Sequence, residues 1–161
     1  MIKHLRIDNR LIHGQVAVTW KANVGAQAII VCNDQVAADP IQKMALPMAA
    51  RGSKVLVYSI AETIKYAQDN PNETMFVICK HPSDALALIQ SGVEIERVNV
   101  GNAAPVAGTQ YVMVTKSIAA TKEDAVVYRQ IAELRGGELR SQMIPTADGI
   151  DFLKALADAG L

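Results

Sequence analysis

The sequence predicts an α/β fold, in the form of an open, mostly parallel, doubly wound sheet flanked by helices. Short apolar runs rich in β-branched residues recur along the chain, and stretches with helical spacing separate them. The clearest of these runs are apolar throughout, as strands are when helices cover both faces of a parallel sheet. No internal repeat, low-complexity tract or linker interrupts the alternation, so residues 1–161 are expected to form a single domain.

Seven segments are predicted as strands. Residues 28–32 (AIIVC) and 75–79 (MFVIC) indicate buried strands most clearly, because they contain no charged or turn-forming residue. Residues 101–110 (GNAAPVAGTQ) are too few and too rich in Gly and Pro for a crossover helix, so the strands on either side are expected to connect differently. The predicted strands are 2–7, 28–32, 54–58, 75–79, 95–100, 111–115 and 138–144.

Six helices are predicted between and after these strands. Ser59 is a suitable N-cap for one helix, and Gly92 and the pair Gly136-Gly137 are typical stop signals for two others. In such a sheet, ligands bind beyond the carboxyl ends of the strands, so the segments that follow the strands are expected to face one another. The predicted helices are 13–22, 38–50, 60–68, 83–91, 121–135 and 148–158.

Composition and charge argue against several classes of protein. The 16 basic and 16 acidic residues cancel, which argues against a general nucleic-acid binder. No apolar run reaches the roughly 18–20 residues that span a bilayer, and charges begin too early at the N-terminus for a signal peptide. Cys32 and Cys79 each end an apolar run, as buried free thiols do in a reducing compartment. We therefore expect a cytoplasmic protein.

The junction between the first predicted strand and the first predicted helix gathers polar residues. Asp8, Asn9 and Arg10 follow the strand, and His13 and Gly14 come three and four residues after the arginine. A helix N-terminus presents N–H groups and a positive dipole to this point, which suits an anion and phosphate above all. Gly14 would permit close approach of the backbone to that anion.

His13 suits the capture of a phosphoryl group. A neutral imidazole is a nucleophile at physiological pH, and a guanidinium with helix N–H groups would neutralise the phosphoryl oxygens. We therefore interpret His13 as the phosphoryl acceptor, with Arg10 as the neutralising group and Asp8 as the group that orients Arg10 or the imidazole. The structural alternatives are an ordinary surface or core histidine and, for Asp8 and Asn9, a turn or helix cap.

Four further residues are predicted to bind the phosphoryl group. Gly14 and Gln15 would do so from the turn that follows His13, and Asn9 and Lys80 from the ends of two strands. Lys80 and the neighbouring His81 would add positive charge, and the alternative for both is an ordinary solvated loop.

No metal or other cofactor is expected. His4, His13 and His81 lie in unrelated segments, and no HxxxH or CxxC spacing occurs. The chain also lacks the GxSxG elbow of serine hydrolases, a Walker loop and a dinucleotide fingerprint. Phosphate chemistry at His13 is therefore the favoured activity.

Three stretches carry a resemblance to a known family. They are RIDNRLIHGQVAVTW from Arg6, VCNDQVAADPIQKMAL from Val31 and VNVGN from Val98. Together they resemble the IIB component of the mannose/fructose/sorbose family of the bacterial phosphotransferase system, as far as about residue 102 and more loosely to the C-terminus. The RxDxRLxHGQV element is the most specific of the three.

The resemblance implies a phosphotransferase that acts as a phosphocarrier. His13 would take a phosphoryl group on Nδ1 from a phosphohistidine of the IIA component, with Asp8 and Arg10 as supporting groups. It would then pass the group to a sugar brought in by the membrane components IIC and IID. The protein would be cytoplasmic and peripherally associated with those membrane components, and a homo-oligomer is expected because the family works in a complex.

The chain departs from the family pattern in two places. Asn9 stands where an acidic residue is common, a variant associated with amino-sugar branches, so an amino sugar such as N-acetylgalactosamine is favoured over mannose, fructose or sorbose. After VNVGN the family often continues with Met-His and a Gly-Lys-rich loop, whereas this chain has AAPVAGTQ. Site roles are therefore not carried over beyond Asn102.

A histidine that meets two protein partners in turn is expected to lie on a shallow, slightly basic docking face. The basic contributors would be Arg6, Arg10, Arg51 and Lys80, and the apolar rim would be Val16, Trp20 and Met48 unless these are core residues. Two other functions stay open. One is a non-catalytic α/β module that binds a phosphorylated metabolite, and the other is a regulatory paralogue that accepts phosphate as a signal.

Overall fold

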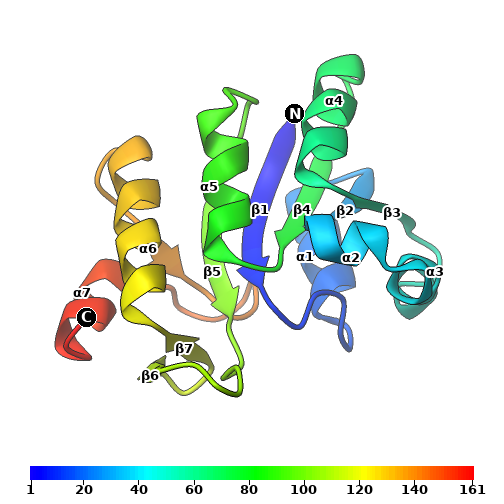
Figure 1. Ribbon diagram of the computed structural model, residues 1–161. Coiled ribbons are helices and arrows are strands. Elements are labelled where there is room, and N and C mark those ends of the chain that lie inside the picture. The colour runs from blue at the N-terminus through cyan, green and yellow to red at the C-terminus, as the bar shows by residue number, and fades with distance from the viewer.

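The computed structural model describes the whole chain, residues 1–161. Its centre is a seven-stranded sheet in the order β3-β2-β4-β1-β5-β8-β9 (Figure 1). The strands from β3 to β8 run parallel, and only β9 is antiparallel to its neighbour β8. The predicted open, mostly parallel sheet is thus confirmed. The strands are β1 (Ile2–Asp8), β2 (Ala28–Cys32), β3 (Lys54–Tyr58), β4 (Met75–Cys79), β5 (Val98–Asn102), β8 (Arg140–Ser141) and β9 (Ile150–Asp151).

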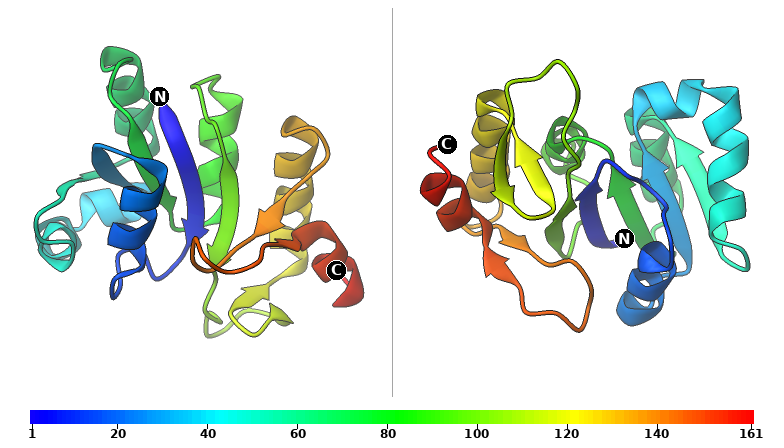
Figure 2. Two further views of the ribbon diagram at one scale, coloured as in Figure 1. Left: turned by 180° about the vertical axis from the view of Figure 1, so that it is seen from behind. Right: turned by 90° about the horizontal axis from the view of Figure 1, so that it is seen from below.

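Helices cover both faces of this sheet. Figure 1 shows α4, α5 and α6 in front of the strands, and the view from behind in Figure 2 brings α1 to the front of the opposite face. The helices are α1 (Val16–Val24), α2 (Asp34–Ala38), α3 (Pro40–Ala49), α4 (Ile60–Asp69), α5 (Pro82–Gln90), α6 (Lys122–Leu134) and α7 (Phe152–Asp158).

Each face of the sheet has its own apolar core, because side chains alternate between the faces along the strands. Ile30 and Val77 belong to a cluster with Leu88 of α5, whereas the neighbouring residues Ile29 and Phe76 pack in a second cluster with Trp20 of α1. Burial on both faces is the reason that these strands are apolar throughout.

An antiparallel hairpin follows β5 and stands apart from the main sheet. Its strands are β6 (Val112–Thr115) and β7 (Ile118–Ala120). The strand predicted at 111–115 is present as β6, but it lies outside the central sheet, because Val112 and Met113 pair with the chain that immediately follows them. Residues 101–110 form no helix, as expected from their Gly and Pro content.

Five other predicted boundaries were wrong. β5 begins at Val98 rather than at residue 95, and only Arg140 and Ser141 of the segment 138–144 are strand. The segment predicted as a helix over 38–50 lies across two helices, because Asp39 is extended and caps α3 ahead of a proline. The first helix begins at Val16 rather than at residue 13, and residues 14 and 15 form a turn that precedes it. The last helix, predicted over 148–158, begins at Phe152, because Ile150 and Asp151 form the strand β9.

No helix of the chain combines the length and the apolar character needed to cross a membrane.

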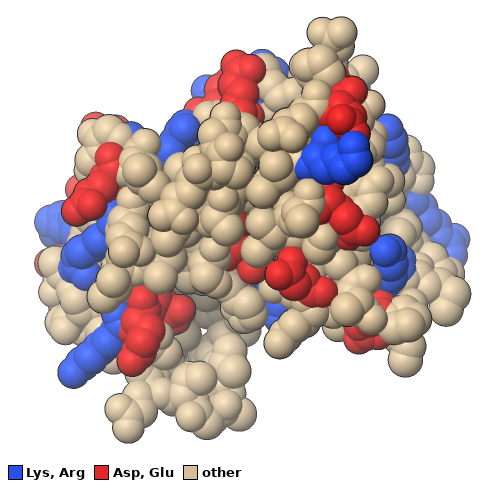
Figure 3. All heavy atoms as spheres, turned by 45° about the horizontal axis from the view of Figure 1, so that its top comes forward, with Lys and Arg blue, Asp and Glu red and all other residues tan.

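Charged side chains are spread over the surface in both signs. On the face seen in Figure 3, Lys and Arg side chains lie among Asp and Glu side chains without gathering into a large patch of one sign. This distribution accords with the formal net charge of zero.

The carboxyl end of β1 lies where the direction of the chain through the sheet reverses. From β1 the chain crosses through α1 on one face to β2, and from β4 it crosses through α5 on the other face to β5, the other neighbour of β1. Connections that leave on opposite faces open a crevice beyond the strand ends, and open α/β sheets bind ligands there. The polar loop that follows β1 is therefore at the position where this fold places its sites.

Candidate functional site

The strand β1 sends a row of polar side chains into the interior. Leu5 and Ile7 pack in the core under α5 and α6, whereas His4, Arg6 and Asp8 alternate with them and point to the α1 face. These three side chains are buried, with 3%, 1% and 0% of each residue exposed. Polar and charged groups are costly to bury unless they are paired, so this row needs a structural or functional reason.

The carboxylate of Asp8 is the hub of the row. Its Oδ2 atom lies 3.1 Å from Nε of Arg6 and 3.2 Å from Nε2 of His13. Its Oδ1 atom accepts a hydrogen bond of 3.0 Å from the backbone N–H of Arg10. The carboxylate therefore fixes both the imidazole and the loop that carries it.

The position of Asp8 determines the tautomer of His13. A carboxylate only accepts hydrogen bonds, so Nε2 of the neutral ring carries the proton and Nδ1 keeps its lone pair. Nδ1 has no hydrogen-bond partner in the protein, and the side chain is 19% exposed. The ring is thus anchored at one nitrogen and presents a bare nitrogen at the other.

Arg6 is the buried counterion of Asp8. Its Nη1 atom donates to the carbonyl oxygen of Gln142 at 3.0 Å, its guanidinium lies over the ring of Trp20, and its Nη2 atom has no partner. Burial lowers the pKa of Arg6, and the charge of Asp8 opposes that effect. The expectation that Arg6 contributes to an exposed docking face was wrong, because alternation along β1 turns it inward.

Gly101 makes room for the guanidinium of Arg6. Gly101 lies on the neighbouring strand β5, and a Cβ atom at this position would overlap the side chain of Arg6. A side chain at residue 101 would therefore displace the group that holds Asp8. Glycine is required at this position for a steric reason, because the guanidinium of Arg6 occupies the space that a side chain would need.

The segment 142–149, which joins β8 to β9, closes over the buried row. The carbonyl oxygen of Gln142 accepts from Asn99 as well as from Arg6, and the carbonyl oxygen of Met143 accepts from Nε1 of Trp20 at 3.1 Å. In the view from behind in Figure 2, this segment crosses below the ends of β1 and β5. The C-terminal part of the chain thus contributes to the support of a site built on its first strand.

The loop between Asp8 and α1 is tightly turned. Leu11 has a φ of 60° and Gly14 a φ of 51°, so two residues adopt the left-handed conformation within one loop. Gln15 precedes the first turn of α1, and both Gly14 and Gln15 are exposed. Arg10 is also exposed, and its side chain has no hydrogen bond or ion pair. Its guanidinium is free to meet a ligand at this surface.

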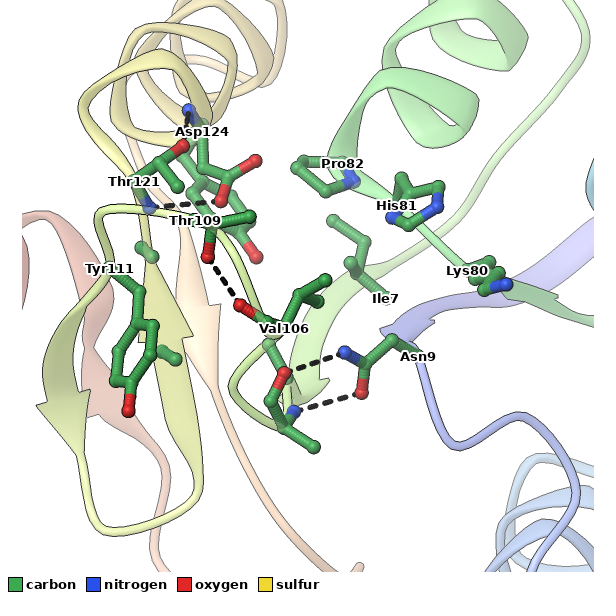
Figure 4. A pocket seen from close by; sticks show the side chains of 15 residues that line it. Ile7, Asn9, Lys80, His81, Pro82, Val106, Thr109, Tyr111, Thr121 and Asp124 are labelled. Carbon is green, nitrogen blue, oxygen red and sulfur yellow. Dashed lines mark hydrogen bonds between the residues drawn. The ribbon is translucent and has the colours of Figure 1, made fainter.

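Asn9 and Lys80 lie on the other side of the loop. The amide of Asn9 accepts from the backbone N–H of Ala104 at 2.8 Å and donates to the carbonyl oxygen of Ala104 at 2.9 Å. Lys80 lines a cavity beside Asn9, and His13 is not among the residues that line that cavity (Figure 4). The predicted phosphoryl-binding residues therefore do not all converge on one point.

The residues predicted for the apolar rim of the docking face differ in their exposure. Trp20 is a core residue with 2% exposure, as the alternative for it stated, whereas Met48 is 62% exposed on α3. Val16 is half-buried at the start of α1, and Arg51 is exposed beyond α3.

His4 ends the buried row without a hydrogen bond. Its ring stacks on Trp20 with a centroid distance of 4.4 Å, and neither ring nitrogen has a partner. Burial, together with the charge of Arg6, lowers the pKa of His4 to about 3, so the ring is neutral at physiological pH. His4 therefore packs as an aromatic ring and adds no charge to the site.

Sequence reasoning missed Gly101 and Gln142 as parts of the site and placed Arg6 on the exposed docking face instead of beside Asp8. The available signal was the alternation of β1, where residues 4 and 6 are polar or charged within the strand predicted over 2–7 and Asp8 continues the same alternation. The contribution of Gln142 is a backbone carbonyl, which leaves no signal in the amino-acid sequence.

Known proteins match this chain over most of its length. The family model described as PTS system sorbose subfamily IIB component matches residues 2–161. The chain is 36% identical over 155 residues to the N-acetylgalactosamine-specific phosphotransferase enzyme IIB component 2 of Escherichia coli K12, covering 94% of this chain and 96% of that protein. It is 34% identical over 152 residues to the sorbose-specific EIIB component of Klebsiella pneumoniae, covering 92% and 90%. The crystal structure of the IIBSor domain of the Klebsiella pneumoniae sorbose permease superposes with a TM-score of 0.89 at 31% identity, covering 98% of this chain and 97% of that one.

Proposed function

This chain belongs to the sorbose subfamily of IIB components of the phosphotransferase system, and from that premise we propose that it is a phosphocarrier whose His13 accepts a phosphoryl group and then donates it to a sugar. One observation carries the proposal: the Asp8 carboxylate lies 3.2 Å from Nε2 of His13. That contact leaves Nδ1 as the nucleophile and gives the ring a fixed orientation.

The first half-reaction is the capture of the phosphoryl group. The lone pair of Nδ1 attacks phosphorus on a phosphohistidine of the IIA donor, the new N–P bond forms, and the N–P bond of the donor breaks with its electron pair returning to the donor ring. As this happens, positive charge builds on the His13 ring, and the Asp8 carboxylate at Nε2 stabilises it. The proton on Nε2 stays in place throughout.

The second half-reaction reverses the role of His13. A hydroxyl oxygen of the sugar attacks phosphorus, the Nδ1–P bond breaks, and the hydroxyl proton is released. The His13 ring returns to its neutral form with the proton still on Nε2 and the lone pair again on Nδ1. Asp8 acts as an orienting group in both directions and is not consumed in either.

Charge balance explains why an aspartate can lie beside an incoming phosphoryl group. Arg6 lies 3.1 Å from Asp8 and neutralises it from within the protein, so the carboxylate repels the phosphoryl oxygens less. Arg10, exposed and without a protein partner, is the group that we assign to those oxygens. The backbone N–H groups of Gly14 and Gln15 are proposed to assist it, with Asn9 and Lys80 at the edge of the site.

The partners follow from the proposed reaction. We propose a phosphorylated IIA protein as donor, the membrane components IIC and IID as the presenters of the sugar, and the whole chain, residues 1–161, as a single unit that works in a homo-oligomer beside the membrane. For the sugar we propose an amino sugar such as N-acetylgalactosamine. The supporting observations are Asn9 and the name of the Escherichia coli relative at 36% identity. Sorbose, mannose and fructose are the alternatives to test in uptake.

The test is a phosphotransfer assay. The purified chain is incubated with a phosphorylated IIA protein, and mass spectrometry locates the label. We expect an acid-labile, alkali-stable phosphate on His13 that is absent from His13→Ala. Reversible ligand binding without a covalent label would instead identify a non-catalytic module. Labelling that supports no sugar uptake in a reconstituted system with the membrane components would identify a regulatory phosphoacceptor.

A further inference from the structure

A cavity opens at the carboxyl edge of the sheet on the side of β1 that does not carry His13. Its volume is about 260 Å³, and it lies among the ends of β1 and β5, the loop after β4, the start of α6 and the β6–β7 hairpin (Figure 4). Cavities of about 300–1,000 Å³ hold drug-sized ligands, so this one suits a smaller molecule. Ile7, Pro82 and Val106 are among its apolar residues, and its polar residues include Lys80, His81, Thr109, Thr121, Asp124 and Tyr128.

Several polar groups that line this cavity have no partner within the protein. The hydroxyl of Tyr128 makes no hydrogen bond, although the residue is only 1% exposed. Asp124 uses Oδ2 to accept from the backbone N–H of Thr121 at 3.0 Å, and its other carboxylate oxygen is free. The side chains of Lys80 and His81 take part in no ion pair or hydrogen bond. None of these atoms is fully enclosed by the protein, and Lys80, His81 and Asp124 are half-buried, so the groups are free to bind a ligand that enters the cavity.

The free groups are divided by charge between two ends of the cavity. Figure 4 shows Lys80 and His81 on one side and Thr121 and Asp124 on the other. Burial and the nearby charge of Asp124 raise the pKa of Tyr128, so its hydroxyl is neutral and can donate as well as accept. One end therefore offers a cation, and the other offers a carboxylate with two hydroxyl groups.

This division matches a ligand that is anionic at one end and rich in hydroxyls at the other. A phosphate would bind at Lys80 and His81, and sugar hydroxyls would donate to Asp124 and exchange hydrogen bonds with Tyr128 and Thr121. The ring of Tyr111 and the apolar residues would contact the faces of the sugar ring. A free anion would leave the Asp124 end unsatisfied, and a neutral sugar would leave the basic end unsatisfied.

From this convergence we propose that the cavity is a binding site for a monosaccharide phosphate, distinct from the His13 site. The choice of ligand class also rests on the proposed function, because a sugar phosphate is the product of that reaction. Hydrogen bonds connect the wall of the cavity to the loop that carries His13. Ala104 lines the cavity, and both of its backbone polar groups bind the side chain of Asn9, the neighbour of Asp8.

The test is ligand binding to the whole chain by isothermal titration calorimetry. Glucose 6-phosphate and glucosamine 6-phosphate are the probes, and glucose and inorganic phosphate represent the two halves. We expect both sugar phosphates to bind at least about tenfold more tightly than either half, because two sets of free groups are satisfied together. Tyr128→Phe should weaken the binding of glucose 6-phosphate about fivefold, since one hydrogen bond is lost. Asp124→Asn should weaken it by a similar factor while keeping the side-chain cap on Thr121.

Lys65→Gln is the matched control, because this lysine is 76% exposed on α4 and is not part of the cavity. Circular dichroism establishes that each variant is folded. Equal affinity for inorganic phosphate, equal affinity for glucose, or binding of glucose 6-phosphate that is unchanged by Tyr128→Phe and Asp124→Asn would each overturn the proposal, as would an absence of binding. His13→Ala separates the two proposals, because it should abolish phosphorylation and leave the binding of glucose 6-phosphate unchanged.

Discussion

The Oδ2 atom of Asp8 lies 3.2 Å from Nε2 of His13, at the point where the first strand leaves the sheet. The aspartate is fully buried and the histidine is partly exposed, so the contact joins the interior of the protein to its surface. An imidazole bound at Nε2 can react only through Nδ1, and its orientation follows from a group that solvent does not reach. Phosphoryl transfer depends on such positioning more than on any covalent contribution of the protein.

Asp8→Asn is predicted to damage both stability and phosphoryl transfer. The substitution keeps the shape but leaves the buried guanidinium of Arg6 without its counterion, which costs about 3–5 kcal/mol in comparable cases. Urea denaturation measures this loss. In the fraction that stays folded, the amide can donate to Nε2 and so favour the wrong tautomer of His13, which ¹⁵N chemical shifts of the imidazole report. Asp69→Asn, at an exposed position of α4, is the control. An unchanged tautomer with a normal transfer rate would contradict the orienting role.

Arg10→Ala is predicted to slow phosphoryl transfer with little change in the free energy of unfolding. The side chain of Arg10 is exposed and has no partner, so its removal leaves no buried group unsatisfied. Loss of one group that neutralises developing charge costs about 100-fold or more in rate at comparable sites. Single-turnover transfer from phosphorylated IIA measures the rate, and thermal denaturation measures the stability. The control is Arg97→Ala, an exposed arginine just before the amino end of β5. If thermal stability collapses and the folded fraction transfers normally, Arg10 is a structural residue.

Gly101→Ala is predicted to act through Arg6. A Cβ atom at residue 101 overlaps the guanidinium, which must then move away from Asp8, and overpacking of this kind costs about 1–3 kcal/mol. The same substitution in an Arg6→Ala background should cost much less, because the clash is gone. A double-mutant cycle by urea denaturation tests the coupling. Gly149→Ala is the matched control, since a Cβ there meets only the flexible end of Arg140. Equal cost in both backgrounds would refute the steric argument.

Sequence reasoning predicted the parallel sheet and the position of His13 in the loop after β1, and it failed where contacts between distant parts of the chain determine the structure. The strands 28–32 and 75–79 were correct to the residue, because burial on both faces leaves an unmistakable apolar run. The hairpin at 112–120 was missed, since a short pairing between adjacent segments has no signal that separates it from a strand of the main sheet. Arg6 was assigned to the surface because arginine is seldom buried, and only its place in the alternation of β1 indicates otherwise.

The pH dependence of stability is predicted to contain a contribution from His4. Burial, with a smaller effect of Arg6, lowers the pKa of this histidine to about 3 in the folded state, against 6.5 for an ordinary histidine. Between these values the unfolded chain binds more protons than the folded one, so stability is greatest above pH 6.5 and falls as the pH falls. The contribution lost is about 2 kcal/mol at pH 5.

His4→Phe isolates this contribution, because the phenyl ring can keep the stacking on Trp20 and cannot be protonated. Urea denaturation of the variant and of the unmodified protein at pH 7, 6 and 5 gives the two pH profiles. The difference in free energy between them should grow toward low pH by about 1.4 kcal/mol per unit once the pH is well below 6.5. Parallel profiles would show that His4 is protonated in the folded protein and that its burial does not keep it neutral.

Asn9→Ala is predicted to release the 101–110 loop from the loop that carries His13. The amide of Asn9 makes two hydrogen bonds with the backbone of Ala104. These bonds join the loop that follows β1 to the loop that follows the neighbouring strand β5. The backbone N–H of Ala104 should then exchange with solvent at least about tenfold faster, because its partner is gone and the loop can open locally. Hydrogen–deuterium exchange followed by mass spectrometry measures this rate. Thr109→Val is the matched control, since it removes a hydrogen bond to Val106 within the same loop and leaves the clamp at Asn9 intact. If Ala104 exchanges at the same rate in Asn9→Ala as in the control, the loop is held by its attachment to the hairpin through Ala103 and Ser117, and the two sites are not coupled through Asn9.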